Sequence, residues 1–234
     1  ELKFDIVVSS EINNELIQLN LDTNLFDSYM VYDVYGLNAL FDWRFVKILN
    51  SYEKIFTVFG PLYSFKKTKK SIVGFAQPWI IYPNNEIYRG YNLANKIKSK
   101  IKYTLQSYFF FREDEVIVEL EHVKSKLNRY KSNANIHVVN NCVSSVFSNR
   151  SQWSELNFPK KNNKIRLGIL SRDYPHKNLR ILPIIGEVLK KKYNFQIRFL
   201  VTLTSQEWRK KDSNFHEYVD NVGKLEVSKC PSFY

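Results

Sequence analysis

The sequence has little cysteine, glycine and proline, and these shortages exclude several classes of protein. Its 234 residues include 2 cysteines, 7 glycines and 7 prolines. Cys142 and Cys230 are too few for the disulfide framework of a small secreted domain. The low glycine and proline content excludes collagen-like and Pro/Gly-rich disordered chains. No stretch approaches the ~20 apolar residues of a membrane-spanning helix, and the start, Glu1–Asp5, is not a signal peptide. We therefore expect a cytoplasmic protein.

Metal-ligand spacing is also absent from the sequence, whereas material for a folded core is plentiful. None of the four histidines lies three or four residues from another, and two cysteines cannot build a zinc site. Hydrophobic residues make up 44% of the chain and aromatic residues 15%. This composition is typical of a folded globular protein.

Positive charge is concentrated in one block of the chain. The net charge is +12, but residues 1–53 carry 3 Lys/Arg and 9 Asp/Glu, whereas residues 54–104 carry 10 and one. Such a block indicates an anionic partner, and a solvated Lys-rich surface is the alternative. Two clusters make up most of the block: Lys66, Lys67, Lys69 and Lys70, and then Lys96, Lys98, Lys100 and Lys102.

The second lysine cluster lies in a predicted amphipathic helix, Lys96–Phe111. Its apolar residues recur at i, i+4, i+8 and i+11, on one helical face, and the lysines lie on the others. We interpret the apolar face as the one that packs on a sheet. Contact of this basic helix with an anionic membrane surface is a further role that the pattern allows. The face consists of Ile97, Ile101, Leu105 and Tyr108.

Short β-rich runs alternate with helical stretches along most of the chain. This order is typical of an α/β fold with parallel sheets flanked by helices. We predict an N-terminal domain at 1–149, a linker at 150–163, and an incomplete second domain at 164–234. The expected strands are 4–8, 55–59, 71–76, 115–120, 135–139, 164–171, 195–203 and 221–226. The expected helices are 96–111, 121–130, 179–192 and 205–219.

The stretch Leu170–Leu179 has the pattern of an anion site. A strand ends, a loop carries Arg172 and Lys177, and a helix is expected to begin near Asn178, a natural N-cap. Ligands of open α/β sheets bind beyond the carboxyl ends of the strands. The positive end of a helix dipole and two cations favour a diphosphate there. The alternative is an ordinary turn that happens to carry cations.

Several segments resemble, in the same order, the retaining GT-B glycosyltransferases of the group 1 (family four) type. Ser171-Arg172 followed by Pro175–Leu179 is similar to the donor-phosphate motif of that family. Ile136–Val143 is similar to the segment that closes the N-terminal domain, although Asn140 stands where the family has proline and Cys142 where it has glycine. The other similar segments are Glu115–Leu127, Phe195–Leu203, Gly223 and Cys230–Tyr234.

The resemblance implies two Rossmann-like domains and transfer of a sugar from a nucleotide-sugar donor to a hydroxyl acceptor. Arg172, Lys177 and Asn178 would bind the donor's diphosphate, and Gly223 with Lys224 would lie beside the nucleobase. No metal and no cofactor are expected, since basic groups take the place of the metal in this family. The paired glutamates of the family would follow Tyr234, and its glycine-rich loop would precede residue 1 or be degenerate here.

The N-terminal domain would then bind the acceptor, with Trp79 and the lysine clusters on that side. Acceptor domains of this family often lie on the inner membrane face, so we expect a saccharide or lipid-linked acceptor and a cell-surface polysaccharide or glycolipid pathway. Two alternatives stay open. The basic charge with interleaved aromatics also fits a nucleic-acid-binding protein, although no nucleic-acid motif is recognisable. A non-catalytic fragment that binds nucleotide-sugars is the other.

Overall fold

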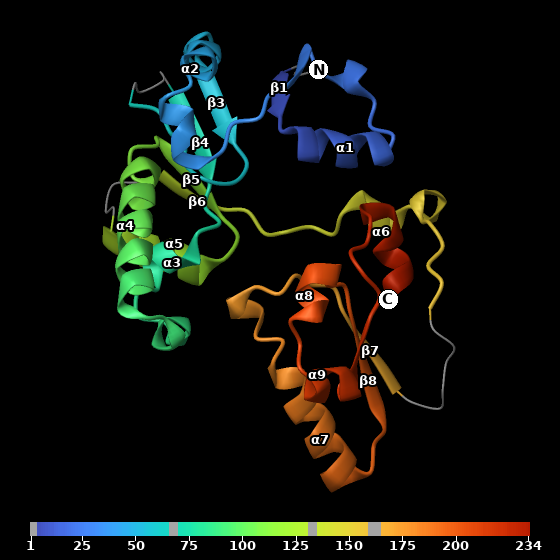
Figure 1. Cartoon of the computed structure of the whole chain (residues 1–234). Coiled ribbons are helices and arrows are strands. Elements are labelled where there is room, and N and C mark those ends of the chain that lie inside the picture. The colour runs from blue at the N-terminus through green and yellow to red at the C-terminus, as the bar shows by residue number, and fades with distance from the viewer. Residues whose placement is uncertain (1–3, 66–69, 131–134, 159–164) are drawn as a thin grey trace. The chain divides into compact units, whose positions relative to one another are not determined.

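The chain forms two compact units, each an α/β arrangement of parallel strands and helices (Figure 1). One unit is Tyr32–Cys142, and the other combines Glu1–Val31 with Val143–Tyr234. This division reflects only which residues lie close together in space. It does not test the predicted boundaries 1–149, 150–163 and 164–234, which stay predictions. The computed structural model describes residues 4–65, 70–130, 135–158 and 165–234.

The unit Tyr32–Cys142 contains a four-stranded parallel sheet in the order β3-β4-β5-β6. Its strands are β3 (Lys54–Thr57), β4 (Lys70–Gly74), β5 (Glu115–Val118) and β6 (Asn135–Val138). The inner strands are rich in β-branched residues that suit a pleated surface covered by helices. Val73 and Val118 are fully buried as a result.

The described residues of this unit form four α-helices, and α3 contacts both α4 and α5, which appear together in green in Figure 1. They are α2 (Trp43–Asn50), α3 (Pro78–Ile81), α4 (Leu93–Phe110) and α5 (Glu121–Tyr130). The core joins the sheet to α3 and to the C-terminal parts of α4 and α5. Phe110 of α4 meets Phe75 edge-on, with ring centroids 4.9 Å apart, and Leu127 of α5 is buried in the same cluster.

The expected orientation of α4 is wrong. Ile97, Ile101, Leu105 and Tyr108 were expected to pack on the sheet, but all four are more than 40% exposed. The residues that pack against the core cluster are instead Tyr103 and Phe110, which lie seven positions apart in the helix. Helical spacing identifies an apolar stripe but does not say which side of the helix meets the core. The orientation follows from the two buried aromatics at the end of α4, Phe109 and Phe110.

The second unit contains a three-stranded parallel sheet in the order β7-β8-β9. Its strands are β7 (Ile165–Ile169), β8 (Ile197–Val201) and β9 (Val219–Asn221). Within Val143–Tyr234 the described helices are α6 (Ser145–Ser148), α7 (Ile181–Tyr193), α8 (Ser205–Arg209) and α9 (Ser213–Tyr218). The helices α7 and α9 contact each other and β8, so they cover the same face of the sheet.

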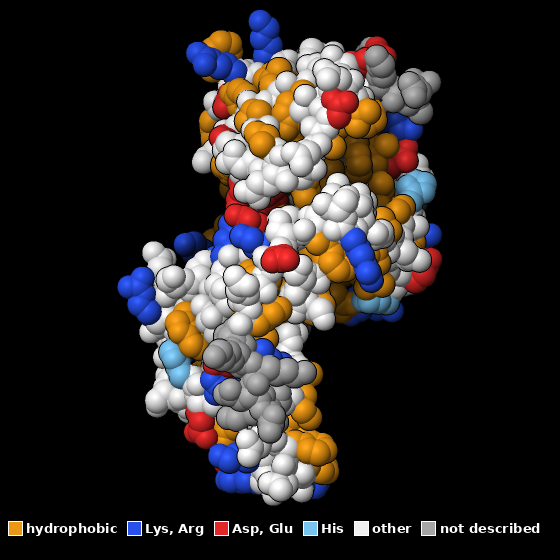
Figure 2. All heavy atoms as spheres, turned by 90° about the vertical axis from the view of Figure 1, so that its right-hand side faces the viewer, with side chains coloured by type: hydrophobic (Ala, Val, Ile, Leu, Met, Phe, Trp, Pro, Cys, Tyr) orange, Lys and Arg blue, Asp and Glu red, His pale blue; other side chains and the backbone are white. Residues whose placement is uncertain are grey.

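A separate β-α-β element begins the chain. Strands β1 (Asp5–Val8) and β2 (Ser28–Val31) pair in parallel, with α1 (Ser10–Gln18) between them. No residue of β1, α1 or β2 is buried. Ile12 and Ile17 of α1, for example, are 45% and 63% exposed. Figure 2 shows apolar side chains (orange) exposed at many places on the face that it presents.

The α/β class with parallel sheets is confirmed, and so are most of the expected strands and helices. The predicted helix 205–219 is wrong in part: α8 and α9 are separated by Lys210–Asp212, and Asp212 starts α9 as its N-cap. Val219 then begins β9, so the strand predicted at 221–226 starts two residues earlier and ends at Asn221. The elements α1, β2, α2, α3 and α6 were not predicted.

Candidate functional site

The predicted site lies at the carboxyl edge of the β7-β8-β9 sheet. Ile169 pairs with Val201, and Val201 pairs with Asn221, so the chain leaves all three strands at one edge. Thr202 ties two of these exits together, because its hydroxyl accepts from the Ser171 amide at 3.0 Å and donates to the Ser171 carbonyl at 3.2 Å. This is the edge at which open α/β sheets bind ligands.

Glu207 holds the Arg172 guanidinium through a single nitrogen, Nε. Its Nε lies 3.1 and 3.2 Å from the two carboxylate oxygens, and the amide of Asp173 donates to Oε1 at 3.2 Å. Glu207 also closes the capping box of α8, where Oε2 accepts from the amide and the hydroxyl of Thr204 at 2.8 Å each. Partial burial raises the pKa of Glu207, but the hydrogen bonds from Thr204, Arg172 and Asp173 outweigh it and set the pKa at about 2.

The terminal nitrogens of Arg172 remain open for a ligand. Nη1 and Nη2 have no hydrogen-bond partner among the residues that the structure describes, and the side chain is 44% exposed. Arg198 of β8 provides the contrast within the same unit. It uses all three nitrogens, on the Asp220 carboxylate and on the carbonyls of Glu217 and Val219, and its side chain is 21% exposed. Arg198 is therefore a structural residue, whereas Arg172 keeps a free fork of donors.

The neighbours of Arg172 leave the loop positive on balance. The only carboxylate within the loop, Asp173, forms an ion pair with Lys211 at 2.7 Å, and the Lys211 side chain is 15% exposed. Lys177 is exposed at the end of a short 3-10 turn, Pro175–Lys177, and has no ion pair in the described part of the chain. Lys177 therefore has no carboxylate partner in the described part of the chain, and Arg172 is paired with Glu207 through Nε alone, which leaves its terminal nitrogens available.

Asn178 does not cap the following helix, contrary to expectation. Its backbone is left-handed, with φ 48°, because it ends the 3-10 turn Pro175–Lys177. Asparagine tolerates that conformation better than most residues. Its side-chain oxygen accepts from Nε of Arg180 at 3.0 Å, and α7 begins only at Ile181. Whether Asn178 also contacts a diphosphate stays a prediction.

Gly223 and Lys224 follow β9 at the same carboxyl edge. Gly223 has φ 90°, a backbone conformation that favours glycine, and its amide donates to Asn221 Oδ1 at 3.2 Å. The Asn221 side chain also pairs with the backbone of Leu203, accepting from its amide at 2.9 Å and donating to its carbonyl at 3.0 Å. Lys224 is exposed. A nucleobase contact by this turn stays a prediction.

The predicted acceptor-side residues are partly described. Lys70 opens β4 and pairs with Glu115 at 2.7 Å, which raises the pKa of Lys70. Trp79 is half-buried in an aromatic cluster, 5.7 Å from Tyr88 and 6.1 Å from Tyr103. The lysines of α4, which are Lys96, Lys98, Lys100 and Lys102, are all exposed. Lys66, Lys67 and Lys69 lie outside the described residues.

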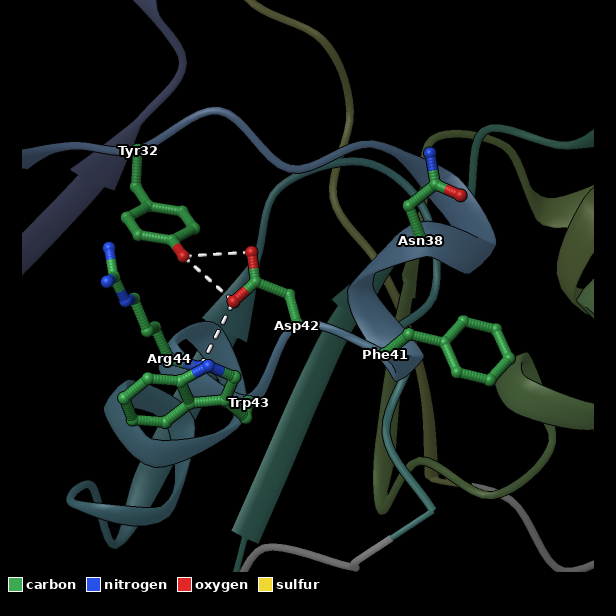
Figure 3. Close-up of a pocket in the computed structure, with 6 residues that line it drawn as sticks. All are labelled: Tyr32, Asn38, Phe41, Asp42, Trp43 and Arg44. Atoms are coloured by element: carbon green, nitrogen blue, oxygen red, sulfur yellow. Dashed lines mark hydrogen bonds between the residues drawn. The ribbon is translucent and has the colours of Figure 1, made fainter.

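A shallow hollow in the unit Tyr32–Cys142 carries a second polar cluster, which sequence reasoning did not single out (Figure 3). The Tyr32 hydroxyl lies 2.9 and 2.8 Å from the carboxylate oxygens of Asp42, which also caps α2 by accepting from the amides of Arg44 and Phe45. The hydrogen bonds from the Phe45 amide and the Tyr32 hydroxyl lower the pKa of Asp42. Each Asp42 oxygen thus has a donor, so the cluster is a helix cap.

Glu207, Thr202 and Asn221 were also missed by sequence reasoning. A signal existed for Glu207, because Thr204 and Glu207 have the spacing of a capping box. Nothing in that spacing indicates that the carboxylate reaches Arg172, 35 residues away in the chain. Within the described ranges, no group of three or more His, Cys, Asp or Glu residues could hold a metal ion. No helix in those ranges is long and apolar enough to cross a membrane.

No protein-family profile matches the chain, and no curated protein sequence matches it significantly. Among solved structures, S. aureus MnaA with UDP aligns over 99% of this chain and 71% of its own, at 9% identity and a TM-score of 0.49. An S. aureus TarM variant with fondaparinux, α-GlcNAc-glycerol and UDP aligns over 67% of this chain, at 20% identity and a TM-score of 0.38. A second TarM structure aligns over 68% of this chain, at 17% identity and a TM-score of 0.37.

The chain spans about a third of the length of TarM, since 34% of each TarM chain is covered. All three TM-scores lie below 0.5. The α/β class is therefore taken from the strand pairing of this chain itself.

Proposed function

We propose that this protein is a glycosyltransferase of the retaining GT-B type, which transfers a sugar from a nucleotide-sugar donor to a saccharide or lipid-linked acceptor in cell-surface polysaccharide or glycolipid synthesis. The observation that carries the proposal is the open fork of Arg172 together with the unpaired Lys177, both in the loop that joins the carboxyl end of β7 to α7. Their spacing along the chain also matches the donor-phosphate motif described above.

The chemistry follows from the charge that develops during transfer. Breaking the bond between the anomeric carbon and the phosphate leaves negative charge on the nucleoside diphosphate. Two cations stabilise that charge more in the transition state than in the bound donor, which lowers the barrier. The acceptor hydroxyl then attacks an electron-poor anomeric carbon. Since Arg172 and Lys177 neutralise the diphosphate, we expect no requirement for a metal ion.

Calorimetric titration of the whole protein with UDP and GDP tests the proposal. Arg172→Ala is expected to weaken binding of the preferred nucleotide by about 10- to 100-fold, because charge-assisted hydrogen bonds are lost. Lys177→Ala is expected to weaken it by about tenfold. EDTA should leave both affinities unchanged.

Lys192→Ala is the matched control for charge, since Lys192 is an exposed lysine in the last turn of α7. It should bind the nucleotide as the wild type does. A wild-type protein that binds neither nucleotide would contradict the proposal. Salt-sensitive binding of a random oligonucleotide in place of UDP would favour a nucleic-acid-binding protein instead.

We further propose that α4 contacts an anionic membrane surface, which places the protein peripherally at the inner face of the membrane. The support is the exposed apolar stripe: Leu93, Ile97 and Ile101 are 73%, 51% and 57% exposed. Helical geometry places Lys96 and Lys100 along one border of this stripe, and Lys98 and Lys102 along the other. The helix contains no acidic residue. An apolar face bordered by lysines suits the headgroup region of an anionic bilayer.

Co-sedimentation with phosphatidylcholine vesicles, with and without one third phosphatidylglycerol, tests this contact. The double variant Lys98→Ser/Lys102→Ser is expected to bind the anionic vesicles about 30-fold more weakly, since each lysine near such a surface contributes about 1 kcal/mol. Replacing Ile97 and Ile101 by serine should also abolish most of the binding, because the apolar contact is lost.

Two control variants separate this surface from general charge and hydrophobicity. Lys47→Ser/Lys192→Ser removes the same charge from exposed positions in α2 and α7. Ile184→Ser/Val188→Ser removes apolar residues of α7 that are 59% and 48% exposed. Both should bind vesicles as the wild type does. Equal losses in the control and the α4 variants would exclude a specific role of α4.

A further inference from the structure

We propose that Glu207 is a positioning residue for Arg172: it fixes the guanidinium through Nε and so presents Nη1 and Nη2 to the diphosphate. This inference rests on the proposed function and assigns a role to a residue outside the phosphate loop. Glu207 lies on α8, which follows β8, whereas Arg172 follows β7. The neighbouring strands bring the two side chains together at the carboxyl edge of the sheet.

The carboxylate is itself firmly held, which a positioning residue requires. Oε2 accepts two hydrogen bonds of 2.8 Å from Thr204, and Oε1 accepts from the amide of Asp173 at 3.2 Å. The Glu207 side chain is 19% exposed, less than half the exposure of the Arg172 side chain that it holds. Glu207 therefore connects the start of α8 to both the backbone and the side chain of the loop.

The geometry of the pair leaves the binding edge of Arg172 unused. A carboxylate that faced both Nη atoms would compete with a phosphate for the same donors. Glu207 instead contacts Nε, at 3.1 and 3.2 Å. Arg198 in the same sheet is the contrasting case of an arginine with no free nitrogen. The Asp220 carboxylate accepts from its Nε and Nη2, and the carbonyl of Glu217 accepts from its Nη1. An arginine pre-ordered in this way loses less conformational entropy when the ligand binds.

Positioning and simple electrostatics predict opposite effects of removing the charge of Glu207. Glu207 is an anion near the site of another anion, so neutralising it should by charge alone strengthen the binding of a diphosphate. If Glu207 positions Arg172, neutralising it should weaken binding, because the guanidinium is no longer fixed. The sign of the change in affinity thus distinguishes the two.

A double-mutant cycle with UDP as the probe provides the test. We expect Glu207→Gln to weaken UDP binding by about tenfold in the protein with Arg172, and to leave it unchanged or slightly stronger in the Arg172→Ala background. A role confined to the stability of α8 would cost the same affinity in both backgrounds. Equal losses in the two backgrounds, or unchanged or tighter UDP binding by the single variant, would overturn the inference.

Asp212→Ala is the control for a lost helix cap. Asp212 caps α9 by accepting from the Phe215 amide at 2.8 Å, and it does not contact Arg172 or Glu207 in the described part of the chain. It should lower the midpoint of thermal unfolding, as Glu207→Gln does, and bind UDP as the wild type does. Weaker UDP binding by Arg172→Ala alone, with Glu207→Gln unaffected, would overturn the positioning role and leave the proposed function intact. Absence of UDP binding by the wild type would overturn both.

Discussion

Gly74→Ala is expected to destabilise the unit Tyr32–Cys142 by about 3 kcal/mol or more, because the added methyl has no space. Gly74 ends β4 and lies beneath the chain that leaves β3. A Cβ at Gly74 would lie 1.8 Å from the carbonyl oxygen of Val58 and 2.9 Å from its carbonyl carbon. These are backbone atoms, so the exit of β3 must move. That movement would also strain the hydrogen bond from the Gly60 amide to the Gly74 carbonyl, at 3.3 Å.

Chemical denaturation of the variant, followed by circular dichroism, measures this effect. Gly90→Ala is the matched control in the same unit, since a Cβ there meets no atom within 4 Å. We expect the control to unfold within about 0.5 kcal/mol of the wild type. A Gly74→Ala protein of wild-type stability would show that the two strand ends do not approach each other as described.

Phe110→Ala is expected to cost about 3–5 kcal/mol, the usual range for removing a buried phenylalanine. Phe110 is 1% exposed and packs edge-on against Phe75, which is itself 7% exposed. The substitution leaves a cavity where the end of α4 meets the sheet. Since whole domains are stable by about 5–15 kcal/mol, a loss of this size removes a large part of the stability of the unit.

The control for Phe110→Ala is Leu93→Ala, at the other end of α4. Leu93 is 73% exposed, so its truncation removes little buried surface, and alanine is a good helix former. Its midpoint in denaturant should match that of the wild type. A loss in Leu93→Ala as large as that in Phe110→Ala would mean that the exposed stripe of α4 is covered in solution.

The elements that the sequence predicted well are those whose pattern is local. Val116 and Val118 of β5 alternate with partly exposed neighbours, and α5 has the predicted bounds, Glu121–Tyr130. Parallel pairing followed from the strand–helix alternation. The β-α-β element at the start was harder, because α1 has no buried residue and only three apolar residues, Ile12, Leu16 and Ile17, among its nine. Only its first strand was found.

The site was predicted in part, for a physical reason. Arg172 and Lys177 are cations in a single loop, so their spacing is visible along the chain. The side chains that hold the loop are not, because Glu207 and Lys211 lie more than 30 residues further on and meet it only through the pairing of β7 with β8. The turn at Asn178 was misjudged because asparagine suits both an N-cap and a left-handed residue.

The side chain of Asn221 adds one further pair of hydrogen bonds at the carboxyl edge of the β7-β8-β9 sheet. Its amide group binds the amide and the carbonyl of Leu203 at 2.9 and 3.0 Å, as the main chain of a further strand residue would. Leu203 is fully buried. The chain segments that follow β8 and β9 therefore stay hydrogen-bonded to each other just past the last backbone pair. This contact fixes the position at which the turn at Gly223 begins. A residue at position 221 without either the donor or the acceptor would allow the segments after β8 and β9 to separate at the carboxyl edge of the sheet, where the ligand is expected to bind.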